Sequence, residues 1–129
     1  RGRIYFLYKK MTETTILKQT MIEASKLGLV CFRNNVGMLP DKNGRMVQYG
    51  LCKGSSDIIG FDRKEGFFVA IECKTDTGRV RKEQQIFLDT VKKSGGFSCI
   101  IRDAKNLKII LDEYRASRYS NKTTETKGD

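Results

Sequence analysis

The stretch from Phe67 to Lys74, with the sequence FFVAIECK, constrains the fold more than any other part of the chain. Its first five residues are apolar, and most are aromatic or β-branched, which is typical of a β-strand. Because side chains alternate between the two faces of a strand, Glu72 and Lys74 point the same way as Ala70. A carboxylate and an ammonium at the end of an apolar strand are costly to bury. We therefore expect Glu72 and Lys74 to face a polar site together.

A second apolar run, residues 57–61 (DIIGF), begins with Asp57 and precedes that strand. The two runs are separated by residues 62–66 (DRKEG), a length that predicts a hairpin with antiparallel strands. Pairing of the strands brings Asp57 within reach of Glu72. Two carboxylates beside Lys74 are suited to hold Mg²⁺ next to a cationic group.

Apolar residues at helical spacing predict a helix between Met11 and Gly28. Thr12 is suited to cap the start of this helix, and Gly28 is suited to end it. Residues 29–35 predict a short strand. Turn signals in residues 36–56 predict a long loop or a hairpin, in which MVQY forms the returning strand.

The chain after Lys74 predicts a crossover connection. Residues 80–96 have the pattern of a helix ended by two glycines, and residues 97–102 (FSCIIR) that of a strand. A strand-helix-strand unit places its two strands parallel, and the continuous apolar content of FSCIIR favours a central position in a sheet covered on both faces. Residues 106–117 predict a short last helix, and the polar residues 117–129 a disordered tail. The predicted fold class is α/β, with a mixed β-sheet flanked by helices.

The net charge of +10 favours a polyanionic partner such as a nucleic acid. Four of the basic residues and no acidic ones lie in residues 1–10, which we expect to be an added or flexible extension before a natural start at Met11. Residues 11–116, the expected domain, hold 18 basic and 13 acidic residues. This smaller excess is equally compatible with an ordinary solvated surface.

The chain has no histidine, so catalysis by a histidine base or by a Ser-His-Asp triad is excluded. Its four cysteines form no closely spaced pair, and we expect free thiols with no zinc site and no disulfides. No apolar run reaches the length of a membrane helix, and no signal peptide is expected. A cytoplasmic protein without a membrane partner is therefore expected, whose chemistry depends on carboxylates, lysine, water and a metal ion.

An aspartate followed by Glu-x-Lys is a weak pattern alone, because such charges also solvate strand ends. The surrounding motifs are more specific, and their order resembles the PD-(D/E)XK nuclease superfamily and, within it, the virus-type replication-repair nuclease (VRR-NUC) domain. The matching pieces, in family order, are Glu13 on an early helix and then residues 33–37 (RNNVG), 54–57 (GSSD), 72–74 (ECK), 84–88 (QQIFL) and 95–103 (GGFSCIIRD). The resemblance covers residues 12–103. One departure is Ser56, which replaces the proline of the superfamily name.

The resemblance implies a metal-dependent DNA endonuclease with a restriction-endonuclease-like core of order α-β-β-β-α-β and a further C-terminal helix. It implies Mg²⁺ or Mn²⁺ as cofactor, bound by Asp57, Glu72 and the backbone carbonyl of Cys73. Lys74 is implied to position or activate the attacking water.

Two further side chains acquire implied roles. Glu13 would bind a second metal ion or hold one of the metal's waters. Gln84 would support Lys74 or the scissile phosphate and completes the implied catalytic set. Stand-alone family members resemble Holliday-junction resolvases, so the resemblance implies a homodimer that cuts branched DNA, in a phage or bacterial cytosol.

Candidate DNA-contacting residues share a basic or polar side chain close to the predicted site: Arg33, Asn34, Lys53, Ser55, Arg79, Arg81 and Lys82. For Arg33 and Asn34 a structural role is an equal alternative, and for Lys53 plain solvation is. For Arg79, Arg81 and Lys82 phosphate contact is slightly favoured over ordinary surface charge. Two other functions stay open at this point. One is a catalytically inactive nucleic-acid-binding module on the same fold, and the other is a nuclease of the same chemistry that acts on RNA or linear duplex DNA.

Overall fold

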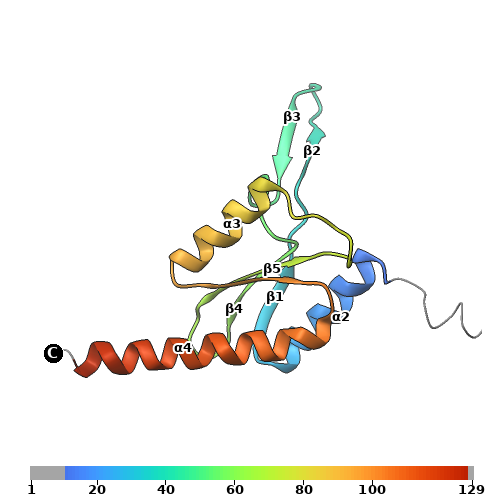
Figure 1. Ribbon diagram of the computed structural model, residues 1–129. Coiled ribbons are helices and arrows are strands. Elements are labelled where there is room, and N and C mark those ends of the chain that lie inside the picture. Colours follow the sequence, from blue (N-terminus) through green and yellow to red (C-terminus); the bar gives the residue numbers. More distant parts are fainter. Residues whose placement is uncertain (1–10, 128–129) are drawn as a thin grey trace, which may run out of the picture.

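The structure, a computed structural model, describes residues 11–127, with side chains up to residue 122. The expected extension at residues 1–10 lies outside the described residues. The chain folds around one four-stranded sheet in the order β1-β4-β5-β6 (Figure 1). Its strands are β1 (Leu29–Arg33), β4 (Ile58–Asp62), β5 (Phe68–Cys73) and β6 (Phe97–Ile101). Strand β4 runs antiparallel to β1 and β5, whereas β6 runs parallel to β5, so the predicted mixed sheet is confirmed.

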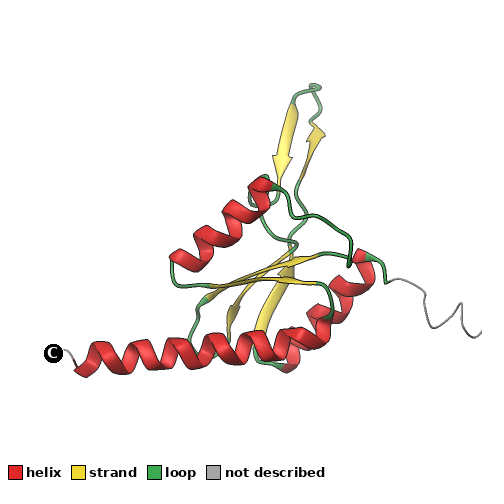
Figure 2. Ribbon diagram, viewed as in Figure 1, coloured by secondary structure: helices red, strands yellow, loops and turns green. Residues whose placement is uncertain are grey.

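Helices cover both faces of the sheet (Figure 2). Helices α2 and α4 lie on one face and α3 on the other, and a 3₁₀ turn, η1, leads into α4. Their bounds are α2 (Glu13–Lys26), α3 (Lys82–Lys93), η1 (Ala104–Asn106) and α4 (Leu107–Lys127). The order α2-β1-β4-β5-α3-β6, followed by α4, is the α-β-β-β-α-β core that the sequence predicted.

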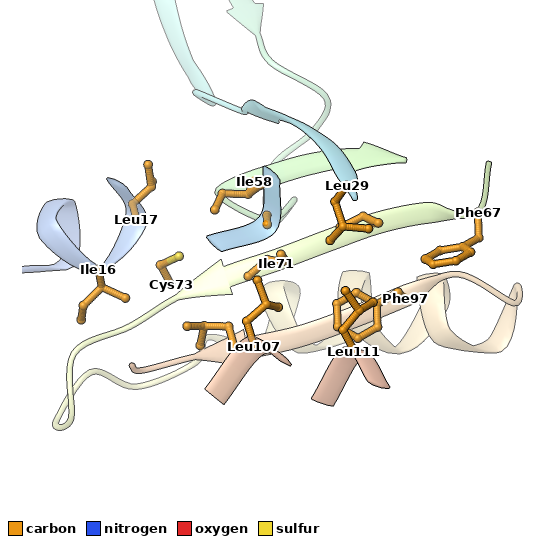
Figure 3. Close-up of a cluster of buried hydrophobic side chains, with 13 residues drawn as sticks. Ile16, Leu17, Leu29, Ile58, Phe67, Ile71, Cys73, Phe97, Leu107 and Leu111 are labelled. Atoms are coloured by element: carbon orange, nitrogen blue, oxygen red, sulfur yellow. The ribbon is translucent and has the colours of Figure 1, made fainter. Parts of the chain in front are cut away.

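The hydrophobic core lies between the sheet and the pair α2 and α4 (Figure 3). Ile71 of β5 and Ile16 of α2 are almost fully buried there, together with Leu107 and Leu111 of α4. Burying each such side chain stabilises the fold by about 1.5–3 kcal/mol, so helix α4 contributes to the core as directly as the strands do.

Local sequence explains where α2 begins and ends. The hydroxyl of Thr12 accepts a hydrogen bond from the Thr15 amide at 3.1 Å, so Thr12 is the N-cap that the sequence predicted. The helix ends just before Gly28, whose φ of +86° is a conformation that glycine adopts at low cost.

The prediction that FSCIIR occupies a central strand is wrong. Strand β6 lies at the edge of the sheet, next to β5 alone. Phe97 and Ile101 are nevertheless 2% and 0% exposed, because α3 and α4 both pack against β6. The continuous apolar pattern therefore reports two covered faces rather than two strand neighbours.

The predicted disordered tail is also wrong for residues 117–127, because α4 continues to Lys127. Two side chains one turn apart anchor the extra turns to the β4–β5 hairpin. Arg118 and Lys122 contact the carboxylate of Glu65 at 2.9 Å and 3.0 Å, and the guanidinium of Arg118 also lies over the ring of Phe67. These contacts with a distant hairpin, rather than local apolar content, anchor the part of the helix that contains Arg118 and Lys122.

A separate hairpin projects from the body of the domain (Figure 1). It consists of β2 (Gly37–Pro40) and β3 (Met46–Tyr49), which pair antiparallel as the sequence predicted for MVQY. Asp41 Oδ1 fixes the turn between them by accepting the backbone N–H groups of Asn43 and Arg45.

Helix α4 also links two connections at the end of the sheet away from the β2–β3 hairpin, namely the one between α2 and β1 and the turn between β4 and β5. The guanidinium of Arg115 donates to the carbonyl of Leu27 at 2.7 Å and to Asp62 at 2.8 Å.

Within residues 11–127, no helix is both long and apolar enough to cross a membrane. All four cysteines are free thiols.

Candidate active site

Three carboxylates from different parts of the chain meet at one end of the sheet. Glu13 begins α2, Asp57 directly precedes β4, and Glu72 lies near the end of β5. One oxygen from each lies within 4.8 Å of the other two. The pairing of Ile58 with Ile71 accounts for the approach of Asp57 to Glu72, because it aligns the residues at the ends of both strands. The structure thus brings together the carboxylates that sequence analysis singled out.

Glu72 is 1% exposed, and its two oxygens have different surroundings. Its Oε1 accepts a hydrogen bond from Gln84 Nε2 at 3.1 Å and lies 3.7 Å from Lys74 Nζ. Its Oε2 is buried and has no hydrogen-bond partner among the described residues. Burial, followed by the nearby charge of Asp57, raises the pKa of Glu72 to about 8. A buried carboxylate with an unsatisfied oxygen is a costly arrangement that a bound cation would relieve.

The donors at this site fit a hard divalent cation. Carboxylate and carbonyl oxygens are the preferred ligands of Mg²⁺ and Mn²⁺, and the cluster of Glu13, Asp57 and Glu72 contains no sulfur or nitrogen donor. A cation there would also offset the repulsion between the three carboxylates.

The backbone of Cys73 connects β5 to Asp57. Its N–H donates to Asp57 Oδ2 at 2.9 Å. In an extended strand the N–H and C=O of one residue lie on the same edge, so the carbonyl of Cys73 is on the Asp57 side of β5. The thiol of Cys73 instead packs in the core, where burial raises its pKa to about 12. Only the backbone of this residue is available to the site.

Lys74 follows Glu72 on the same face of the chain and is 9% exposed. Its backbone N–H donates to the carbonyl of Ile101 at 3.0 Å, which fixes the end of β5 against β6. The ammonium is therefore held beside the carboxylates by both its backbone and its ion pair with Glu72.

Gln84 bridges helix α3 and the carboxylates. Its Oε1 accepts the N–H of Arg81 at 2.9 Å at the start of α3, and its Nε2 donates to Glu72. Sequence analysis expected Gln84 to support Lys74 or a phosphate. In the structure its amide donates to the carboxylate of Glu72, and it is 5% exposed.

Asn34 holds the loop that carries Asp57. Its N–H donates to the carbonyl of Asp57 at 2.7 Å, and its side-chain amide donates to Ser55 Oγ at 2.8 Å and to Ser56 O at 2.9 Å. Ser55 Oγ in turn donates to the carbonyl of Cys52. Of the two roles considered for Asn34, the structure therefore shows the structural one, and Ser55 has a similar role.

Gly54 permits this loop to pack tightly on helix α3. Its φ is +89°, and a Cβ atom there would lie 2.7 Å from the carbonyl oxygen of Glu83. Any other residue would need both a strained backbone and a shift of the helix.

A cleft of about 400 Å³ opens between this loop, the start of α3 and the β2–β3 hairpin. Both Asp57 and Gln84 line it. Four of the seven candidate DNA-contacting residues also line it, namely Asn34, Lys53, Ser55 and Arg81. The other three, Arg33, Arg79 and Lys82, are exposed on the surface and do not line the cleft.

Sequence analysis missed three residues at the site. Arg102, at the end of β6, donates to the carbonyls of Thr75 and Gly78 and so fixes the loop after Lys74. A basic residue at the end of an apolar strand was the available signal. The hairpin residues Met38 and Gln48 also line the cleft, and no local sequence signal connects them with Asp57.

Comparison with protein families identifies one match that covers most of the chain. The family model described as the VRR-NUC domain matches residues 11–104, which include all three carboxylates, Lys74 and Gln84. No match was found among curated proteins.

Proposed function

Because this chain belongs to the VRR-NUC domain family, a family of nucleases, we propose that it is a Mg²⁺- or Mn²⁺-dependent endonuclease that hydrolyses phosphodiester bonds in branched DNA. Four-way junctions and flaps are the substrates we propose. The observation that carries the proposal is the buried Glu72, whose Oε2 accepts no hydrogen bond from the described residues and lies in a cluster of carboxylates beside an ammonium.

The residues suited to hold the metal ion are Asp57, Glu72, the carbonyl of Cys73 and, on the exposed side, Glu13. When bound, such an ion polarises a phosphoryl oxygen and lowers the pKa of a coordinated water. Gln84 keeps the Glu72 carboxylate in one orientation through its hydrogen bond to Oε1.

Lys74 supplies a positive charge 3.7 Å from the carboxylate of Glu72. We propose that its ammonium orients the attacking water and offsets the negative charge that develops on the phosphate in the transition state. Its burial favours this role, because electrostatic interactions are stronger where water is excluded. We also propose that Arg81 and Lys53, which line the cleft, bind the DNA backbone.

The proposal is tested by incubating the protein with labelled four-way junctions, flaps, linear duplexes and RNA of matched sequence. Cleavage of the branched DNA with Mg²⁺ or Mn²⁺, abolished by EDTA, is the expected result. Lys74→Ala should abolish turnover but leave binding of metal and DNA nearly unchanged. If Lys74→Ala cuts as fast as wild type, the mechanism is wrong.

The same comparison separates the two other functions. Cleavage of RNA or linear duplex in preference to branched DNA would retain the chemistry and change the substrate. Salt-sensitive DNA binding, with neither cleavage nor divalent-metal heat in calorimetry, would identify an inactive binding module. We also propose a homodimer, which light scattering during gel filtration measures directly.

A further inference from the structure

The β2–β3 hairpin exposes large apolar side chains on both of its faces. Met38 and Met46 are 56% and 57% exposed on one face, and Leu39 and Val47 are 62% and 51% exposed on the other. A two-stranded hairpin is only marginally stable in water, and exposed apolar patches of this kind mark binding surfaces. Nothing in the described part of the chain covers these side chains.

One face of the hairpin is continuous with the candidate active site. Met38 and Gln48 are direct partners in the hairpin and both line the cleft that contains Asp57. Pro40 and Met46, the next pair on the same face, extend this surface towards the tip. We call Met38, Pro40, Met46 and Gln48 the cleft-side face, and Leu39 with Val47 the outer face.

The side chain of Asn34 connects the base of the hairpin to the loop that carries Asp57. Asn34 Oδ1 accepts the N–H of Leu51, just after β3, while the amide nitrogen of the same side chain holds Ser55 and Ser56. The hairpin and Asp57 are therefore positioned by the same residue. A molecule that binds against the cleft-side face is placed relative to the carboxylates.

Charge favours a nucleic acid over a second copy of the chain as the occupant. Residues 37–53 contain three basic residues, Lys42, Arg45 and Lys53, and one acidic residue, Asp41. The Asp41 carboxylate is occupied by backbone N–H groups of the turn. Two such hairpins would repel each other, whereas a polyanion would be attracted to both the tip and the base.

The apolar side chains indicate which feature of DNA is contacted. Methionine and proline are among the residues that proteins insert between base steps, where they unstack the bases. In an intact duplex the base faces are stacked and inaccessible, whereas a branch point interrupts the stack and exposes them. Apolar side chains beside the site therefore contribute more binding free energy with branched DNA than with linear duplex.

We propose that the β2–β3 hairpin distinguishes branched DNA from intact duplex, with its cleft-side face packing against an exposed base at the branch point and its tip on the flanking backbone. The proposal rests on the proposed nuclease function, because it takes DNA as the molecule in the cleft. It adds a substrate-selecting role for Met38 and Met46, which lie outside the carboxylate cluster.

The test measures binding without cleavage, in EDTA, on a four-way junction that carries 2-aminopurine at the branch point and on a linear duplex of the same sequence. The double variant Met38→Ser/Met46→Ser is compared with Leu39→Ser/Val47→Ser, a matched control that removes two apolar side chains of similar exposure from the outer face. Wild type should raise the 2-aminopurine fluorescence, because a base held against the hairpin can no longer restack on its neighbours, and loss of stacking relieves its quenching.

We expect the cleft-side variant to lose this rise and to bind the junction about tenfold more weakly, with little change on linear duplex. The outer-face variant should behave as wild type. The proposal is overturned if the cleft-side variant keeps both the fluorescence rise and the junction affinity, or if the outer-face variant loses as much. It is also overturned if the cleft-side variant turns a dimer into a monomer in light scattering, since that face would then be an interface between copies.

These outcomes are distinguishable from failure of the proposed function. If no DNA is cut with Mg²⁺ or Mn²⁺, the nuclease proposal fails, but the binding and fluorescence measurements in EDTA still test the hairpin. Because all four replaced side chains are more than half exposed, neither double variant is expected to unfold the domain, which circular dichroism checks.

Discussion

Replacing Glu72 with glutamine is expected to stabilise the metal-free protein at pH 8 and to change its stability little at pH 5. The reason is that Glu72 has a pKa of about 8 in the folded protein, against an ordinary value of 4.5, because it is buried beside Asp57. Below pH 4.5 the carboxyl is neutral in both the folded and the unfolded chain. As the pH rises towards 8, the unfolded chain ionises first, so the free energy of unfolding falls.

The size of the effect follows from the two pKa values. Each tenfold change in proton affinity corresponds to about 1.4 kcal/mol, which gives roughly 5 kcal/mol once the group is fully ionised. Most of this loss, roughly 3–4 kcal/mol, falls between pH 5 and pH 8. Glutamine has almost the same shape as glutamate and keeps a carbonyl oxygen for the hydrogen bond from Gln84, but it cannot ionise. The variant should therefore lack this decline.

The assay is urea denaturation of wild type and Glu72→Gln in EDTA at pH 5 and pH 8. Adding Mg²⁺ at pH 8 should stabilise wild type, by about 2.7 kcal/mol at a hundred times its dissociation constant, and leave the variant unchanged. The reasoning is refuted if the difference in unfolding free energy between the two proteins is the same at both pH values. An equal difference at both pH values would mean that Glu72 has the same pKa in the folded protein as in the unfolded chain.

Two further substitutions test the contacts around the carboxylates. Gln84→Ala removes the amide that donates to Glu72 and should weaken Mg²⁺ binding in calorimetry by about 10- to 100-fold, and an unchanged affinity would contradict its orienting role. Gly54→Ala should destabilise the protein by at least about 1–3 kcal/mol in urea, because it combines a φ of +89° with a clash against Glu83. Gly44→Ala is its matched control, with a φ of +79° and open space around the site, so an equal loss in both variants would contradict the close approach to α3.

Much of the topology could be predicted because it depends on local chemistry and loop length. A five-residue turn between two apolar runs was enough to pair β4 with β5, and this pairing placed Asp57 beside Glu72. The crossover through α3 fixed β6 as a parallel neighbour of β5. Thr12 was identified as an N-cap from its residue type and position alone.

The errors arose where the outcome depends on contacts between distant parts of the chain. Apolar content shows that β6 is buried but not which strands flank it, so its edge position was missed. The polar end of α4 has no core of its own, and it is anchored by Glu65 and Phe67. The hydrogen bond from Gln84 to Glu72 was not predicted either, because it depends on side-chain geometry at the start of α3, which no sequence pattern specifies.

The part of the chain that defines the family is shorter than the part that must fold together. The family match ends at residue 104, before Leu107 and Leu111, which are both fully buried against the sheet. Arg115, farther along, ties Leu27 to Asp62. A polypeptide that ended at the family boundary would keep every catalytic candidate and α2, but the part of the sheet face that α4 covers would be open to water. The smallest part of the chain that can fold alone therefore includes the first turns of α4. A truncated protein should be designed to keep that helix, rather than to end where the family match ends.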